Sequence, residues 1–102
     1  MDTQQKISHL VAKGLPLLAP PIRDWTEGHL IAPRKVKLAT DPDGKEYKEY
    51  WLVTDNNGNK DSSYRVVYDD MEESFGLECT LESGVEWFMG LYGEFSETVE
   101  SM

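Results

Sequence analysis

The segment Asp41-Pro42-Asp43-Gly44 constrains the fold of this chain more than any other short stretch of the sequence. Aspartate favours the first position of a tight turn, proline fixes the φ of the next residue, and glycine accepts a left-handed conformation. Alternating apolar and polar residues precede this segment over 29–40 and follow it over 45–54. The pattern therefore predicts two antiparallel strands joined as a hairpin. Pro33 predicts an edge strand or a β-bulge in the first strand, because proline cannot donate a hydrogen bond to a neighbouring strand.

Three more strands are expected in the second half of the chain, at residues 64–69, 75–81 and 85–92. Polar connections at 55–63 and 70–73 precede the first two of them, and such short connections favour an antiparallel meander. In the strand 75–81, the alternation predicts that Phe75, Leu77, Cys79 and Leu81 point inward and that Gly76, Glu78 and Thr80 point outward.

The segment 85–102 fits two different patterns. The spacing of its apolar residues and a capping-box sequence at 83–86 favour one long amphipathic helix. Against a helix, Gly90 and Gly93 would each cost ~1 kcal/mol relative to alanine, and the crowded apolar residues would leave no polar face. We therefore predict a strand over 85–92 and a short helix over 94–101. That helix should place Phe95, Val99 and Met102 inward and Glu94, Glu97 and Glu100 outward.

The N-terminal region predicts one helix and one irregular segment. Residues 3–13 have the pattern of a helix that Asp2 or Thr3 caps and that Gly14 ends. Prolines within 15–24 predict an extended connector, because proline fixes the backbone and biases the residue before it toward extended conformations. Residues 25–28 are then expected to form a turn that leads into the sheet.

The order of these elements predicts the fold class. With 102 residues, the chain is close to the common size of one domain and can bury one core. We expect a single α+β domain over residues 1–102. It should contain an antiparallel sheet of about five strands in a meander, an N-terminal helix and a short C-terminal helix.

Acidic residues are concentrated in the second half of the chain. The formal net charge is −9, from 10 Lys and Arg against 19 Asp and Glu. Residues 51–102 hold only two of the basic residues, and residues 74–102 hold none. Such a field repels nucleic-acid phosphates and attracts a basic protein. Solubility alone is the other interpretation of this acidity.

The sequence also bears on location. Cys79 is the one cysteine, so an internal disulfide framework is excluded and a reducing compartment fits. Prolines interrupt the apolar patch at 15–22, and no basic leader precedes a continuous apolar core, so we do not expect a signal peptide. No apolar run approaches the ~20 residues that a membrane helix needs. We expect a cytoplasmic protein that binds neither membrane nor nucleic acid.

One loop partly follows the pattern of a calcium-binding loop, with alternating oxygen side chains at Asp55, Asn57, Asn59 and Asp61. The pattern then fails, because Lys60 stands where that loop needs glycine and Val66 stands where it needs a bidentate glutamate. The same residue types are common in ordinary strand connections. We therefore predict a plain polar loop and no metal site.

Catalytic chemistry finds little support in the sequence. Cys79 would need a nearby base to act as a nucleophile, and the two candidates, His9 and His29, are both distant in sequence. A cysteine packed as a small apolar residue is the favoured interpretation. The acidic turn at 69–73 would supply paired carboxylates for acid–base chemistry, but several acids in one short turn are more often solvated. We expect neither an enzyme nor a cofactor.

Three hypotheses about function remain. The first is a small acidic interaction protein, of an inhibitor, immunity or regulatory type, that presents its acidic half to a basic partner. The second is a small-ligand or enzymatic domain that uses Cys79 or His29 in a pocket between sheet and helix. The third is a self-associating structural subunit, so the chain is expected as a monomer or a homodimer. For the first, the expected surface combines carboxylates with aromatic anchors: Asp69, Asp70, Glu72, Glu73, Glu78, Glu86, Trp87 and Tyr92.

Overall fold

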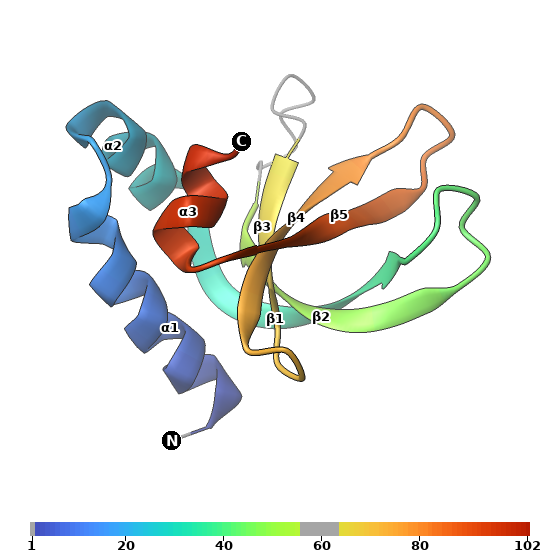
Figure 1. Cartoon of the computed structure of the whole chain (residues 1–102), viewed down its shortest axis with the longest axis horizontal. Coiled ribbons are helices and arrows are strands. Elements are labelled where there is room, and N and C mark those ends of the chain that lie inside the picture. Colours follow the sequence, from blue (N-terminus) through green and yellow to red (C-terminus); the bar gives the residue numbers. More distant parts are fainter. Residues whose placement is uncertain (1, 56–63) are drawn as a thin grey trace.

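Helices lie to one side of a curled five-stranded sheet, as Figure 1 shows. The computed structural model describes residues 2–55 and 64–102. The predicted α+β fold, an antiparallel meander with an N-terminal helix and a short C-terminal helix, is confirmed. In chain order the elements are α1 (Thr3–Gly14), the 3-10 helix η1 (Leu15–Leu17), α2 (Pro20–His29), β1 (Leu30–Ala39), β2 (Tyr47–Thr54), β3 (Tyr64–Asp69), β4 (Ser74–Thr80), β5 (Glu86–Gly93) and α3 (Phe95–Glu100).

The sheet closes on itself, which the sequence did not predict. Consecutive strands pair antiparallel in the order β1-β2-β3-β4-β5. Ala39 at the end of β1 also pairs in parallel with Trp87 near the start of β5. The tips of two hairpins meet there, since a Cβ added to Gly44 would lie 3.1 Å from the Val85 side chain. Periodicity describes each strand separately, whereas closure depends on the tilt and stagger of all strands together.

The turn predicted at 41–44 is present. The Gly44 N–H donates to the Asp41 carbonyl at 3.2 Å, and Gly44 has a φ of +71°, the left-handed conformation that the turn requires. The Asp41 carboxylate accepts the backbone N–H groups of Glu46 and Lys45 at 2.9 and 3.0 Å. The bond from Glu46 is the main cause of a lowered pKa at Asp41. The aspartate therefore fixes the start of the return strand.

The irregularity predicted at Pro33 is a β-bulge. The register of β1 against β2 shifts between Leu30 and Arg34. The Pro33 carbonyl accepts a hydrogen bond from the Gln4 side chain at 2.8 Å. Helix α1 therefore covers the part of β1 that leaves the regular ladder.

The prediction of an extended connector over 15–24 is wrong. Most of this segment is helical, in η1 and α2, and α2 also replaces the turn that was expected at 25–28. Pro20 and Pro21 lie in the first turn of α2, where backbone N–H groups have no partner within the helix and the φ of proline is already helical. Ala19, which precedes them, is extended, with φ −61° and ψ 145°. These prolines therefore begin a helix.

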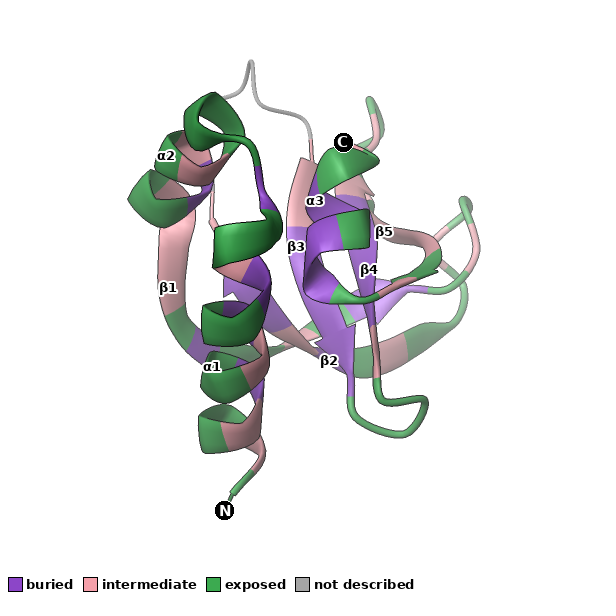
Figure 2. Ribbon diagram, turned by 60° about the vertical axis from the view of Figure 1, so that its left-hand side comes forward, coloured by how far each residue is buried: buried purple, intermediate pink, exposed green. Residues whose placement is uncertain are grey.

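The core has two parts, one on the face of the sheet that packs against the helices, here called the helix face, and one on the opposite face. Figure 2 shows buried residues along the strands of the sheet. On the helix face, the rings of Tyr68, Phe75 and Phe95 meet edge to face, with successive centroids 4.9 and 5.4 Å apart. The buried residues of the helix face are Ile7, Val11, Leu18, Val53, Val66, Tyr68, Phe75, Leu77, Phe95 and Val99. Those of the opposite face, here called the inner face, are Leu38, Tyr50, Leu52 and Val67.

The C-terminal segment follows the prediction of a strand and a short helix. Helix α3 buries Phe95 and Val99 against the helix face, and Met102 packs beside them partly buried. The three glutamates expected to point outward, Glu94, Glu97 and Glu100, are exposed. The amphipathic pattern of residues 94–101 therefore indicated the buried side of this helix correctly.

Two predictions concern metals and membranes. Asn57, Asn59 and Asp61 of the calcium-like pattern lie outside the described residues. Within 2–55 and 64–102, no three His, Cys, Asp or Glu side chains are grouped so that they could hold a metal ion. No helix in those same ranges is long and apolar enough to cross a membrane.

Candidate interaction groove

Asp69, the first residue of the predicted acidic surface, is buried at the end of β3. Only 3% of it is exposed, and its carboxylate accepts a hydrogen bond from Lys48 Nζ on β2 at 2.7 Å. This bond is the main cause of a raised pKa at Lys48. The other carboxylate oxygen accepts the backbone N–H groups of Met71 and Glu72 at 3.0 and 3.2 Å. Asp69 therefore holds the turn from within and is not part of an exposed surface.

Glu78 points inward, contrary to the prediction from alternation. It is 1% exposed, and Arg65 Nε donates to it at 2.5 Å from the paired position on β3. Arg65 also contacts Glu86 at 3.0 Å and Asp55 at 3.8 Å. Burial raises the pKa of the Glu78 carboxyl, and Arg65 opposes that shift. The prediction failed because the curled sheet buries its inner face as well as its helix face. Side chains on both sides of β4 are therefore covered.

The remaining predicted residues fall into two groups. Glu86 and Trp87 lie at the start of β5, where the sheet closes. Tyr92, which is 38% exposed, lies at the other end of β5. There the backbone approaches the β3–β4 turn, because Ser74 Oγ donates to the Gly93 carbonyl at 3.3 Å. Three exposed turn residues lie at that same end of the molecule: Asp70, Glu72 and Glu73.

The surroundings of Cys79 do not favour a nucleophile. Burial is the main cause of a raised pKa at the Cys79 thiol, and Glu78 raises it further, so the thiolate is disfavoured. His29, one of the expected bases, stacks on Trp25 with ring centroids 4.2 Å apart. Its Nδ1 lies 2.7 Å from the Trp25 carbonyl oxygen. His9, the other, is exposed on α1.

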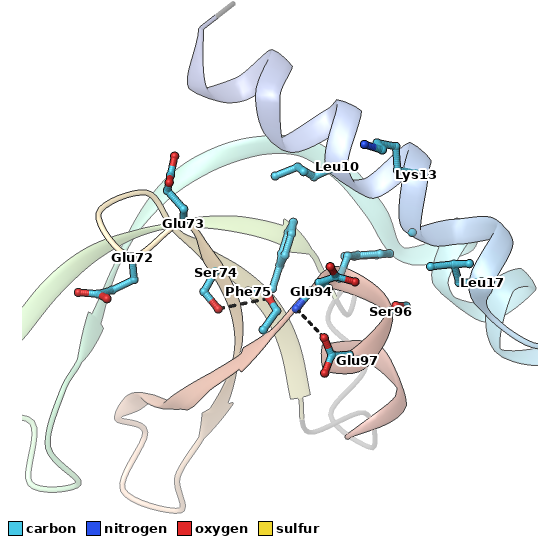
Figure 3. Close-up of a pocket in the computed structure, with 13 residues that line it drawn as sticks. Leu10, Lys13, Leu17, Glu72, Glu73, Ser74, Phe75, Glu94, Ser96 and Glu97 are labelled. Carbon is cyan, nitrogen blue, oxygen red and sulfur yellow. Dashed lines mark hydrogen bonds between the residues drawn. The ribbon is translucent and has the colours of Figure 1, made fainter.

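A groove of about 580 Å³ lies between α1, the β3–β4 turn and α3 (Figure 3). One wall, here called the α1 wall, is formed by α1 and the adjoining η1. Helix α1 contributes Leu10 and Lys13 to it, and η1 contributes Leu17. The facing side is formed by the turn and by the start of α3, which contribute Glu72, Glu73, Glu94, Ser96 and Glu97. These segments are far apart in the sequence, so only the folded chain brings them together.

The floor of the groove is apolar. It is formed by Phe75 and Phe95, whose side chains belong to the core of the helix face. Gly14 lets α1 approach α3 closely, because a Cβ at this position would lie 3.0 Å from the Phe95 ring. Leu10 is half-buried beside the floor, and Leu17 is 66% exposed at the end of the α1 wall. The α1 wall therefore presents aliphatic surface to solvent.

The rim of the groove is acidic. Four glutamates that line it are exposed, and Lys13 is the one basic residue among the described residues of the lining. Glu73 binds Lys6 at 2.6 Å, and this hydrogen bond lowers the pKa of Glu73. The side chains of Glu94 and Glu97 accept each other's backbone N–H in a capping box, which holds both at the start of α3. The rim can therefore attract cations to a defined place.

Sequence reasoning found only part of this groove. Glu72 and Glu73 were predicted as surface residues, whereas Leu17 was assigned to an extended connector. Residues 94–101 gave one usable signal, since every residue expected on the outer side of that helix is a glutamate. No local pattern in the sequence, however, predicts that this helix packs beside the β3–β4 turn.

No family model, curated protein or solved structure matches this chain. The geometry of the chain itself therefore defines its class. It is a small α+β protein whose described surface includes a groove with an apolar floor and an acidic rim.

Proposed function

We propose that this chain is a protein-interaction module that binds a basic segment of a partner protein in the groove between α1 and α3. One observation supports the proposal above all: four exposed glutamates from two distant segments line one groove with an apolar floor. A cationic side chain placed there would be attracted by several carboxylates at once. The adjoining apolar surface would exclude part of the surrounding water and strengthen that attraction.

The charge of the whole chain adds to the attraction. A net charge of −9 on 102 residues steers a basic protein toward the module before contact is made. This long-range part is screened over about 10 Å at 0.1 M salt, so association should weaken as salt is added. Inhibitor, immunity-type and regulatory proteins can all act in this way, by occupying a basic site. We expect such a module to act in the cytoplasm, without a cofactor or catalytic residues.

A fluorescent decalysine peptide tests the charge of the groove. Binding is followed by fluorescence anisotropy in about 20 mM salt, where screening is weak. We expect the double variant Glu72→Gln/Glu94→Gln to bind the peptide about fivefold more weakly than the wild type, because two rim carboxylates are lost. Glutamine keeps the hydrogen-bond acceptor that α3 uses at its start.

The matched control is Glu46→Gln/Glu82→Gln. Both residues are exposed and lie at the two hairpin tips, away from the groove, and the control has the same net charge as the groove variant. We expect it to bind decalysine almost as well as the wild type does. Equal losses in the two variants would mean that only the overall charge matters, and the proposed site would be rejected.

A further inference from the structure

We infer that the basic segment carries aliphatic side chains between its cationic ones, and that Leu17 is the apolar anchor that receives them. This inference rests on the proposed function, and it names the chemistry of the partner at the same groove. An exposed leucine alone would need no explanation. Leu17 differs because it lies at the wall of a concave site, on the same wall as Leu10 (Figure 3).

The charges of the groove are arranged unequally on its two sides. The carboxylates stand on the side of the turn and α3, whereas the α1 wall carries Lys13 between Leu10 and Leu17. Lys13 makes no ion pair with any described residue, so it would repel a cation that approached the α1 wall. A uniformly basic segment would therefore meet attraction on one side and repulsion on the other.

A segment that alternates cationic and aliphatic side chains fits both sides. In an extended segment, successive side chains point in opposite directions, so the lysines can face the glutamates while the aliphatic groups face α1. Contact with Leu17 would remove apolar surface of both partners from water. The groove would then distinguish partner segments by the alternation of their cationic and aliphatic side chains as well as by their charge.

Two acetylated peptides, GKLKLKG and GKSKSKG, test this inference because they carry the same charge. We expect the wild type to bind the leucine peptide about fivefold more tightly than the serine peptide, from partial burial of leucine. Leu17→Ser should reduce that preference to about twofold or less without changing the affinity for the serine peptide. Leu17→Met should retain the preference, because methionine also presents apolar surface. Binding is measured by anisotropy with labelled peptides.

The control is Leu91→Ser, which removes another exposed leucine that does not line the groove. It should keep the full preference for the leucine peptide. If Leu17→Ser also keeps the preference for the leucine peptide, the apolar anchor is rejected. The proposed function then still stands if Glu72→Gln/Glu94→Gln weakens the binding of decalysine. If that double variant has no effect either, both proposals fail.

Discussion

The inner face of the sheet and the groove between α1 and α3 both carry acidic residues, but they hold them in opposite ways. On the inner face, Asp69 and Glu78 are buried, and each is bound to a cation from a neighbouring strand. At the groove, Glu72 and Glu94 are exposed and retain room for a partner. The acidity of a chain therefore does not identify its binding surface. Burial and existing cation partners decide which carboxylates can bind something else.

Asp69 and Glu72 make the same point within a single turn. Three positions separate them, yet Asp69 is 3% exposed and accepts the backbone N–H of Glu72, whereas Glu72 itself is exposed at the groove. The Asp69 carboxylate stabilises the turn through hydrogen bonds, whereas the turn exposes the Glu72 carboxylate at the groove. Substitutions on the two sides should therefore affect different properties, stability on the inner face and binding at the groove.

Breaking the inner ion pair should have the largest effect. Arg65→Met leaves Glu78 buried without its main cation, so the free energy of unfolding should fall by about 3 kcal/mol. Urea unfolding at neutral pH measures the change. Replacing both partners, as Arg65→Met/Glu78→Leu, should recover much of the loss, because no buried charge is then left unpaired. A loss below about 1 kcal/mol in the single variant would contradict the burial described for this pair.

Crowding the inner face should have the next largest effect. A Cβ on Gly76 would lie 2.4 Å from the Gly90 carbonyl oxygen, so Gly76→Ala forces β4 and β5 apart and should cost about 2 kcal/mol. The matched control is Gly28→Ala in α2, where nothing lies within 4 Å of the added Cβ. That variant should gain about 0.5 kcal/mol from a less flexible unfolded chain. Equal effects in urea unfolding would mean that β4 and β5 are not packed as closely as described.

The smallest expected effect is the change of the free energy of unfolding with pH. This change should have opposite signs for a carboxylate of the inner face and a carboxylate of the groove. Burial raises the folded pKa of Glu78 above its ordinary value of 4.5. The stability of the wild type relative to Glu78→Gln should therefore fall as pH rises above 4.5. The hydrogen bond from Lys6 lowers the folded pKa of Glu73 at the groove. The stability of the wild type relative to Glu73→Gln should accordingly fall as pH drops below 4.5. Urea unfolding of the three proteins across this range measures both trends, and trends of the same sign would contradict the contrast.

Much of the fold could be predicted because its signals are local. The turn at 41–44, the strand at 64–69 and the helix at 94–101 each depend on residues close in sequence, and all are confirmed. The prolines in the first turn of α2 misled the prediction, because proline disrupts the interior of a helix but is accepted in its first turn. The outward orientation predicted for Glu78 was wrong because alternation assumes that one face of a strand meets water.

By itself, the sequence determined the order of the five strands and the two terminal helices, the sharp turn between β1 and β2 and the excess of negative charge in the second half. Turn chemistry, helix capping and side-chain alternation act over a few residues, so they can be recognised without the fold. Only the tertiary structure decided which carboxylates are buried against Lys48 and Arg65 and which line the groove with Leu17. Burial and ion pairing depend on side chains from other strands and helices, and no local pattern in the sequence specifies those neighbours.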